Sequence, residues 1–283
     1  MTPAPNLAPQ PRKASALDAL LARSPAAVMG VLNVTPDSFS DGGRYFDPEL
    51  ALAHATQMVA EGAGIIDIGA ESTRPYGGMT PVSAEDEIAR LRPVLSRVAA
   101  LGIPVSVDTM KAKVARFALG AGAAVINDVW GLQRDPAMAG VVAEHDVPIV
   151  IMHNRAVVDP AIDIMAEIAD YFTNSLAIAA RAGIHRDRIV LDPGIGFGKT
   201  PEQSMIALAR LADLTAFGCP LLVGASRKRF IASVAPSEPG ERLGGSLAAH
   251  LTAVRNGARI IRAHDVAATV QALAVMTAIE QRR

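Results

Sequence analysis

The chain has 283 residues, of which 50% are hydrophobic, and its 27 Lys and Arg residues nearly balance its 28 Asp and Glu residues. A chain of this size can bury one large core, and its balanced charge provides no broad basic field to hold nucleic acid or an anionic membrane. The single cysteine cannot form an internal disulfide, and no run of about 18 apolar residues predicts a membrane span. We expect a cytoplasmic protein that binds small molecules.

The first 24 residues are rich in Pro and Ala and contain only a short mixed apolar stretch, residues 16–22. Such a stretch is too short and too broken for a secretory signal or a membrane anchor. We expect a flexible N-terminal extension over residues 1–24, with about one helical turn, and a single domain over residues 25–283.

Eight short apolar runs follow, each ending at a polar residue. They cover residues 28–34, 65–68, 104–107, 123–126, 148–152, 189–191, 221–223 and 258–261. Segments with helical spacing lie at residues 49–61, 88–99, 112–119, 136–144, 163–182, 201–211, 241–256 and 266–280. Alternating strands and helices predict a parallel sheet, and no Gly-x-Gly-x-x-Gly follows the first run, which disfavours an open dinucleotide-binding sheet. The prediction is an α/β fold, a closed (β/α)8 TIM barrel.

Two segments after the first two runs are longer than the few residues usual in such turns, residues 35–47 and residues 73–82. Both are rich in Gly and Pro. Long loops on the catalytic rim of a barrel commonly close over substrates. We expect these two loops to act as lids.

Three short polar side chains end three different strands of the predicted barrel: Asp108, Asn127 and Asp192. Strand ends converge on one mouth of a closed parallel barrel, so these groups can face a single ligand. Their carboxylate and amide groups suit a flat heterocycle that presents an edge of N–H and N groups. The alternative for Asp108 and Asp192 is that each caps the helix or turn after it.

Cations concentrate after the seventh and eighth runs. Residues 226–229 read Ser-Arg-Lys-Arg, and Arg262 and His264 follow the eighth run. These two loops often hold phosphate in such barrels, and Arg binds phosphate oxygens through two donors. A basic run can also be a solvated face, but cations on two adjacent strand ends favour an anion site.

The segment from Asp192 to Thr200 is rich in glycine and closes with Gly-Lys-Thr. A nucleotide-binding phosphate loop needs four residues between its first glycine and Gly-Lys-Ser/Thr, and Gly194 is one residue too close. We therefore reject a nucleoside triphosphate site. The glycines are interpreted as positions where the backbone approaches a ligand that Phe197 covers.

The histidines and the cysteine show no metal-ligand spacing, so the sequence predicts no structural zinc site. Asn33 and Asp41 are oxygen donors near the expected anion site. Mg²⁺ takes one or two protein oxygens and completes its shell with phosphate and water, which such a pair can provide. The alternative is that both residues simply form turns.

Taken in order, these motifs resemble those of dihydropteroate synthases, a family of folate-pathway enzymes with a pterin-binding barrel. The matching segments are residues 33–43, 67–75, 106–109, 126–128, 192–199, 226–228 and 262–266. Each motif alone is weak, but seven in the same order are specific. The resemblance covers residues 29–266.

The resemblance implies condensation of hydroxymethyl-dihydropterin pyrophosphate with para-aminobenzoate to give dihydropteroate and pyrophosphate. It assigns the pterin ring to Asp108, Asn127, Asp192 and Lys228, with Asp192 on the amino and ring N–H edge and Lys228 near the carbonyl. It assigns the pyrophosphate to Asn33, Thr73, Arg74, Arg262 and His264, Mg²⁺ to Asn33 and Asp41, and the aminobenzoate to Phe39, Pro75, Phe197, Ser226, Lys228 and Arg229. The implied catalytic residues are Asn33, Asp41, Arg74, Lys228, Arg262 and His264.

The resemblance also implies sensitivity to sulfonamides, which imitate para-aminobenzoate, and a homodimer formed through residues 241–256 and 266–280. Two other functions compete. A methyltetrahydrofolate:corrinoid methyltransferase-like domain would share the Asp-Asn-Asp ring site but would not need the anion machinery. A non-catalytic pterin-binding paralogue would be expected to have lost residues such as Lys228 or His264, and both are present.

Overall fold

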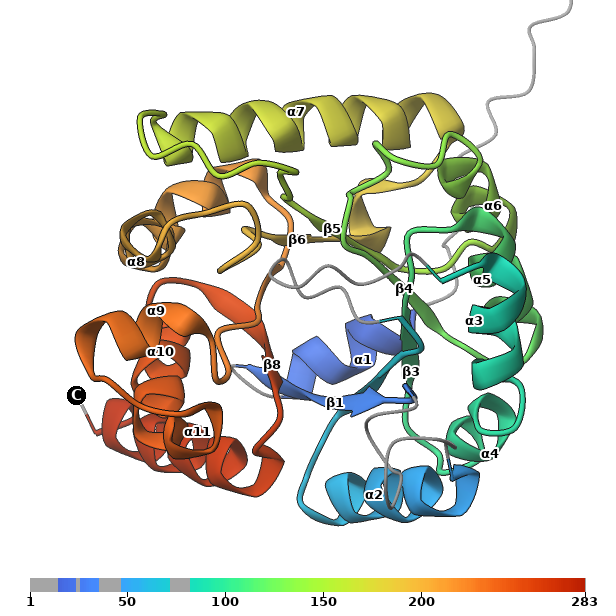
Figure 1. Ribbon diagram of the computed structural model, residues 1–283, viewed down its shortest axis with the longest axis horizontal. Helices are drawn as coiled ribbons and strands as arrows, with labels where there is room; N and C mark the ends of the chain where they lie inside the picture. The colour runs from blue at the N-terminus through green and yellow to red at the C-terminus, as the bar shows by residue number, and fades with distance from the viewer. Residues whose placement is uncertain (1–14, 24–25, 36–46, 72–81, 283) are drawn as a thin grey trace, which may run out of the picture.

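The computed structural model describes residues 15–23, 26–35, 47–71 and 82–282. Its eight strands pair in parallel and close into a barrel in the order β1 to β8 (Figure 1). The strands are β1 Ala27–Asn33, β2 Ile65–Gly69, β3 Val105–Asp108, β4 Val125–Asp128, β5 Ile149–Met152, β6 Ile189–Asp192, β7 Leu221–Val223 and β8 Ala258–Ala263. The predicted TIM barrel is confirmed, and all eight apolar runs form strands.

Helices surround the strands and connect them (Figure 1). The α-helices are α1 Ala16–Arg23, α2 Pro48–Ala60, α3 Ala84–Leu91, α4 Leu95–Ala99, α5 Ala112–Gly120, α6 Met138–His145, α7 Ile164–Ala182, α8 Pro201–Ala209, α9 Arg229–Val234, α10 Leu243–Arg255 and α11 Val266–Glu280. Three 3₁₀ helices are η1 Arg186–Arg188, η2 Leu211–Phe217 and η3 Pro239–Glu241.

Helix boundaries follow local capping and proline chemistry. Asp47 caps α2 by accepting the N–H groups of Glu49 and Leu50, and Ser83 caps α3 by accepting the N–H of Asp86. The single helix expected over residues 88–99 is instead two helices, because Pro93 lacks the N–H that an uninterrupted helix would use. The short helix α9 was not predicted.

Alternation along the strands separates an apolar layer from a polar layer inside the barrel. A buried cluster takes one residue from seven strands: Met29, Ile65, Val125, Val150, Val190, Leu222 and Ile260. Side chains two residues apart on a strand share a face, so the next inward positions are Val31, Asp67, Asn127, Met152, Asp192, Gly224 and Arg262. The polar functional groups therefore stand directly above an apolar floor.

The helix α1 packs against the side of this apolar cluster that faces away from the polar groups. Leu17 is only 3% exposed and belongs to the same cluster, with Leu20 and Leu21 packed against it. Figure 1 shows α1 within the outline of the ring of strands. The expected extension thus contains more than one helical turn, because leucines at helical spacing can bury the open end of the barrel. Residues 1–14 lie outside the described part of the chain.

Within the described residues, no helix combines the length and the apolar composition needed to cross a bilayer.

Candidate active site

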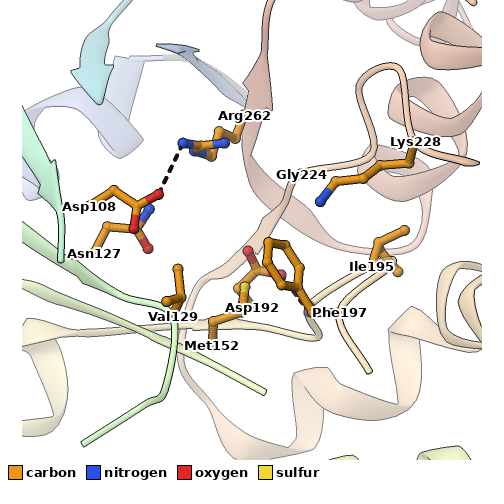
Figure 2. A pocket seen from close by; sticks show the side chains of 11 residues that line it. Asp108, Asn127, Val129, Met152, Asp192, Ile195, Phe197, Gly224, Lys228 and Arg262 are labelled. Carbon is orange, nitrogen blue, oxygen red and sulfur yellow. Dashed lines mark hydrogen bonds and ion pairs between the residues drawn. The ribbon is translucent and has the colours of Figure 1, made fainter. Parts of the chain in front are cut away.

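A pocket lies at the carboxyl ends of the strands (Figure 2). Its lining residues are Asp108, Asn127, Val129, Met152, Asp192, Gly194, Ile195, Phe197, Gly224, Lys228 and Arg262. The four residues that the resemblance assigns to the pterin ring come together there, although they lie on four different strand ends or loops. Phe197 and Arg262, expected at neighbouring subsites, line the same pocket.

Arg262, which lines the pocket, is the centre of an ion-paired cluster. Its Nε lies 2.7 Å from Asp67 Oδ2. Its Nη2 lies 3.3 Å from Asp108 Oδ2 (Figure 2). Asn127 Nδ2 donates to the same Asp67 oxygen at 3.1 Å. One buried carboxylate thus orients both the cation and the amide that face the pocket.

Asp67 was missed as a site residue. It is fully buried between Ile66 and Ile68 on β2. A charged residue inside an apolar strand was the available signal, since buried carboxylates require a charged or hydrogen-bonding partner. Its partner Arg262 lies far away in sequence on β8, which adjoins β1 rather than β2.

Burial raises the pKa of both carboxylates that line the pocket. The pKa of Asp108 is raised to about 8, by burial first and then by the charge of Asp67, and Arg262 opposes the shift. The pKa of Asp192 is raised by burial to about 6, and the N–H of Gly194 and the charge of Lys228 oppose it. Burial thus makes both carboxyl groups weaker acids than an exposed aspartate, and the nearby cations limit the shift.

The glycine-rich turn after β6 forms one wall. The N–H of Gly194 donates to Asp192 Oδ1 at 2.7 Å, and a Cβ at Gly194 would lie 2.0 Å from the carbonyl oxygen of His153. Only glycine fits there, because the φ of +67° also disfavours a side chain. The ring of Phe197 stands under Lys228, with Nζ 4.0 Å from the ring centroid. The turn thus brings backbone and an aromatic face to the pocket.

The cations of the β7 and β8 loops do not all face the same way. The guanidinium of Arg227 pairs with Asp265 at 2.5 and 3.0 Å, so it links the two loops instead of facing an anion. Arg229 is exposed at the first residue of α9. Within the described residues, the cations that line the pocket are Lys228 and Arg262.

His264 is held by Ser226 rather than by an acid. Ser226 is 5% exposed, accepts the N–H of His264 at 3.2 Å, and lies 3.0 Å from its Nδ1. A hydroxyl that already accepts this N–H can donate its own proton to Nδ1, which leaves the proton of a neutral ring on Nε2. Burial and the charge of Arg262 lower the pKa of His264 to about 4. Ser226, expected at an aminobenzoate pocket, contacts His264.

Asn33, at the end of β1, reaches the rim beside Asp108. A Cβ at Gly69 would be 3.6 Å from Asn33 Oδ1 and 3.9 Å from Asp108 Oδ2, so both oxygens flank this glycine. Among the described residues, no group of three His, Cys, Asp or Glu side chains is arranged to hold a metal. The expected site residues Phe39, Asp41, Thr73, Arg74 and Pro75 lie outside the described residues, as do residues 36–46 and 72–81 of the expected lids.

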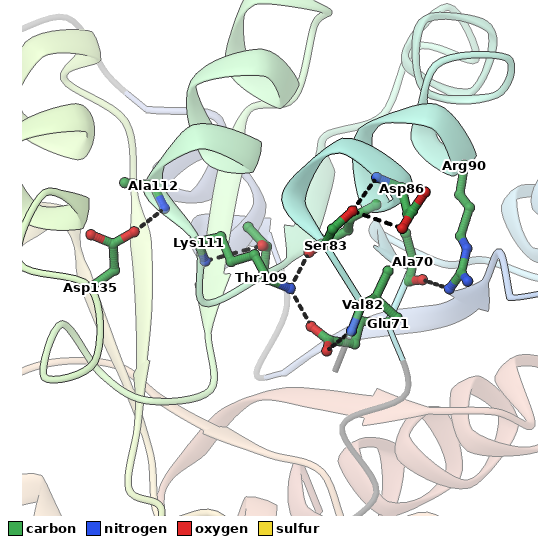
Figure 3. Close-up of polar contacts among 11 residues, drawn as sticks. Ala70, Glu71, Val82, Ser83, Asp86, Arg90, Thr109, Lys111, Ala112 and Asp135 are labelled. Atoms are coloured by element: carbon green, nitrogen blue, oxygen red, sulfur yellow. Dashed lines mark hydrogen bonds and ion pairs between the residues drawn. The ribbon is translucent and has the colours of Figure 1, made fainter. Parts of the chain in front are cut away.

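A second polar cluster lies beside the rim at the two ends of residues 72–81 (Figure 3). Lys111 Nζ contacts Glu71 Oε2 at 2.5 Å and Glu87 Oε2 at 2.7 Å. Glu71 Oε1 accepts the N–H of Val82 at 3.0 Å. This cluster joins the end of β2 to the start of α3 and to the loop after Asp108.

Comparisons with known proteins agree with this geometry. A family model described as pterin binding enzyme matches residues 29–264. The dihydropteroate synthase of Bacillus subtilis is 47% identical over 249 residues, which are 88% of this chain and 86% of that protein. A solved Clostridium difficile dihydropteroate synthase, in the presence of pteroic acid, has a TM-score of 0.86 at 45% identity and covers 90% of this chain and 96% of that chain. A Yersinia pestis dihydropteroate synthase with a sulfonamide drug has a TM-score of 0.84 at 40% identity, covering 91% and 95%.

Proposed function

Because this chain belongs to the pterin-binding enzyme family and functions as a dihydropteroate synthase, we propose that the pocket of Figure 2 holds the dihydropterin ring while pyrophosphate leaves. The reaction joins hydroxymethyl-dihydropterin pyrophosphate to para-aminobenzoate, so the enzyme is a transferase. The observation that carries the proposal is the pair of buried carboxyl groups in one small pocket, with Asp108 Oδ1 unpartnered among the described residues.

Four residues contact the ring in this proposal. Asp192 accepts hydrogen bonds from the amino group and the ring N–H, Asn127 binds the neighbouring edge, and Lys228 donates to the carbonyl. Asp108 faces the part of the ring where positive charge develops as the leaving group departs. A developing cation lowers the pKa of a nearby carboxyl group, so the ionised form of Asp108 is favoured as the ring becomes positive.

Loss of pyrophosphate is the difficult step, because the arylamine that attacks is already neutral near pH 7. Arg262 and the Nε2–H of His264 bind the departing oxygens more strongly as negative charge accumulates, which lowers the barrier selectively. Asn33, Thr73 and Arg74 complete the pyrophosphate site in this proposal. The neutral state of His264 lets it donate a hydrogen bond without a second cation next to Arg262.

We assign Mg²⁺ to Asn33 and Asp41. Asn33 Oδ1 is an amide oxygen at the rim, and Mg²⁺ commonly takes one or two protein oxygens and fills its remaining positions with phosphate and water. The donor chemistry therefore fits an ion that arrives with the pyrophosphate. When bound, Mg²⁺ neutralises charge on the leaving group.

The aminobenzoate lies against Phe197 and the stem of Lys228, with Phe39, Pro75 and Arg229 completing its pocket. A sulfonamide is expected to compete with para-aminobenzoate, because both present an arylamine opposite an acidic group. Initial rates of dihydropteroate formation, measured at several concentrations of each compound, should give a raised KM for para-aminobenzoate and an unchanged maximal rate. Inhibition that does not respond to para-aminobenzoate would contradict the assignment of this pocket.

The two competing functions make different predictions. The relatives compared with this chain are named dihydropteroate synthases, which favours the synthase over a corrinoid methyltransferase-like domain. A non-catalytic paralogue would bind the pterin substrate without releasing pyrophosphate. Formation of dihydropteroate from the two substrates by the purified chain tests this point, and tight pterin binding with no product would support the paralogue.

We propose a homodimer through α10 and α11. Val275 and Ile279 on α11 are 55% and 57% exposed and lie one helical turn apart, and Leu243 at the start of α10 is a further exposed apolar side chain. Sedimentation at micromolar concentration should give twice the 29.5 kDa chain mass, and Ile279→Glu should shift it toward the monomer. A monomeric wild-type protein would contradict the proposal.

We place the enzyme in the cytoplasm, where the buried thiol of Cys219 stays reduced.

A further inference from the structure

Lys199 is a lysine buried at the back of the active-site wall. It is 1% exposed and is one of the largest fully buried side chains of the described part of the chain. It follows the glycine-rich turn, in the Gly-Lys-Thr sequence that superficially matches a phosphate loop. Its side chain is folded inward under the turn, so it cannot bind a phosphate at the surface.

The ammonium group of Lys199 has three acceptors. Nζ lies 2.6 Å from His153 Nδ1, 2.9 Å from the carbonyl oxygen of Gly194 and 3.2 Å from that of Phe197. Three acceptors match the three N–H donors of a protonated amine. Two of them are on the turn and the third is at the end of β5, so one side chain fixes the turn against the neighbouring strand.

The partner His153 is suited to accept this bond. Burial and the nearby charges of Lys199 and Arg155 lower the pKa of His153 to about 2, so its ring is neutral. Acceptance at Nδ1 leaves the proton on Nε2, which is buried without a partner among the described residues. The edge of the ring packs against Tyr171, with centroids 4.9 Å apart. Tyr171 in turn donates to the carbonyl oxygen of Trp130 at 2.6 Å, which supports this arrangement.

Lys199 also places a positive charge near Asp192. The cations that act on Asp192 are Lys228, Lys199 and Arg262, and all three lower its pKa against the effect of burial. Around Lys199 itself, Asp192 and Glu167 favour the charged form, while burial, Lys228 and Arg155 disfavour it and lower its pKa to about 7. Unlike Lys228 and Arg262, Lys199 does not line the pocket. The charge of Lys199 can therefore act on Asp192 although Lys199 does not contact the substrate.

We propose that Lys199 is a positioning residue for the reaction: its buried ammonium fixes the turn that carries Phe197 and keeps Asp192 ionised for the pterin ring. This inference rests on the proposed role of Asp192 as the acceptor of the ring N–H groups. Loss of Lys199 removes a nearby positive charge, so it raises the pKa of Asp192. The ionised fraction of Asp192, which is the form that binds the ring, therefore decreases. The same loss releases the carbonyl groups of Gly194 and Phe197.

The test uses Lys199→Met, which removes charge and hydrogen bonds, and Lys199→Gln, which removes the charge and keeps an N–H donor. The probe is hydroxymethyl-dihydropterin without pyrophosphate, titrated by fluorescence, because it reports on the ring site alone. We expect both variants to bind it about tenfold more weakly at pH 5, because raising the pKa of Asp192 by about one unit lowers its ionised fraction about tenfold there. We also expect the acidic limb of kcat/KM for the pterin substrate to move up by about one pH unit. Lys113→Met is the matched control, since this lysine is 63% exposed on α5 and should change neither value.

A cycle with Asp192→Asn separates an electrostatic role from a purely structural one. If the charge acts through Asp192, Lys199→Gln should weaken ring binding much less in the Asp192→Asn background than in the wild type. An equal loss in both backgrounds with an unmoved acidic limb would overturn the inference, as would failure of both Lys199 variants to fold. If the Asp192→Asn variant bound the ring as tightly as the wild type, the proposed ring site would be wrong. This outcome can be distinguished from failure of the inference about Lys199.

Discussion

Asp192→Asn is expected to lower kcat/KM for hydroxymethyl-dihydropterin pyrophosphate about a hundredfold to a thousandfold, the usual cost of removing one group that stabilises a charged transition state. The amide can still accept the N–H of Gly194, which donates to Asp192 Oδ1 at 2.7 Å, so the turn should keep its shape. What is lost is the negative charge that faces the ring as it becomes positive. Steady-state rates with saturating para-aminobenzoate measure this effect.

The pH dependence of the same variant gives an independent check. Burial raises the pKa of Asp192 to about 6, and the ionised form is the active one, so wild-type kcat/KM should fall as the pH drops through 6. This acidic limb should be absent from Asp192→Asn. Asp170→Asn is the matched control, because Asp170 is exposed on α7 and distant from the turn in sequence. A retained limb in Asp192→Asn would assign the titration to another group.

Arg262→Met is expected to abolish measurable turnover and to destabilise the fold. Arg262 is the shared cation of Asp67 and Asp108, at 2.7 and 3.3 Å. Removing it leaves buried carboxyl groups without their partner, which costs about 3–5 kcal/mol of unfolding free energy in comparable pairs. The pyrophosphate also loses a donor that acts when charge develops. Urea denaturation measures the first effect, and single-turnover pyrophosphate release measures the second.

A double variant distinguishes the two effects of Arg262. In Arg262→Met with Asp67→Asn, one uncompensated charge is removed, so stability should recover in part while turnover stays absent. Arg210→Met, which removes an exposed arginine paired with Asp213, is the control and should change little. Near-wild-type pyrophosphate release by the Arg262→Met variant would contradict the proposed role of Arg262.

Much of this architecture could be predicted because it depends on local pattern. Apolar runs of three to seven residues, separated by amphipathic segments, predicted the strands. Polar residues at their ends predicted Asp108, Asn127 and Asp192 at one mouth. Period-two alternation explains why these groups stand above the apolar cluster that contains Val125 and Val190. The glycines after β6 were interpreted as positions where the backbone approaches a ligand, and their positive φ, as at Gly194, was not predicted.

The features that could not be predicted depend on partners distant in sequence. Whether Arg227 faces an anion or Asp265 is decided by how the β7 loop meets β8, and neither periodicity nor composition contains that information. The same holds for Ser226, which supports His264, and for the inward orientation of Lys199. In each case the side chain has more than one possible partner, and only the folded barrel determines which one it contacts.

The most direct test of the central claim is pyrophosphate release from hydroxymethyl-dihydropterin pyrophosphate, followed with and without para-aminobenzoate and Mg²⁺. We expect release that requires Mg²⁺, increases with para-aminobenzoate and yields an equal amount of dihydropteroate. Pterin binding without release would show that the barrel mouth recognises the ring but does not expel the leaving group, and would contradict the proposed mechanism.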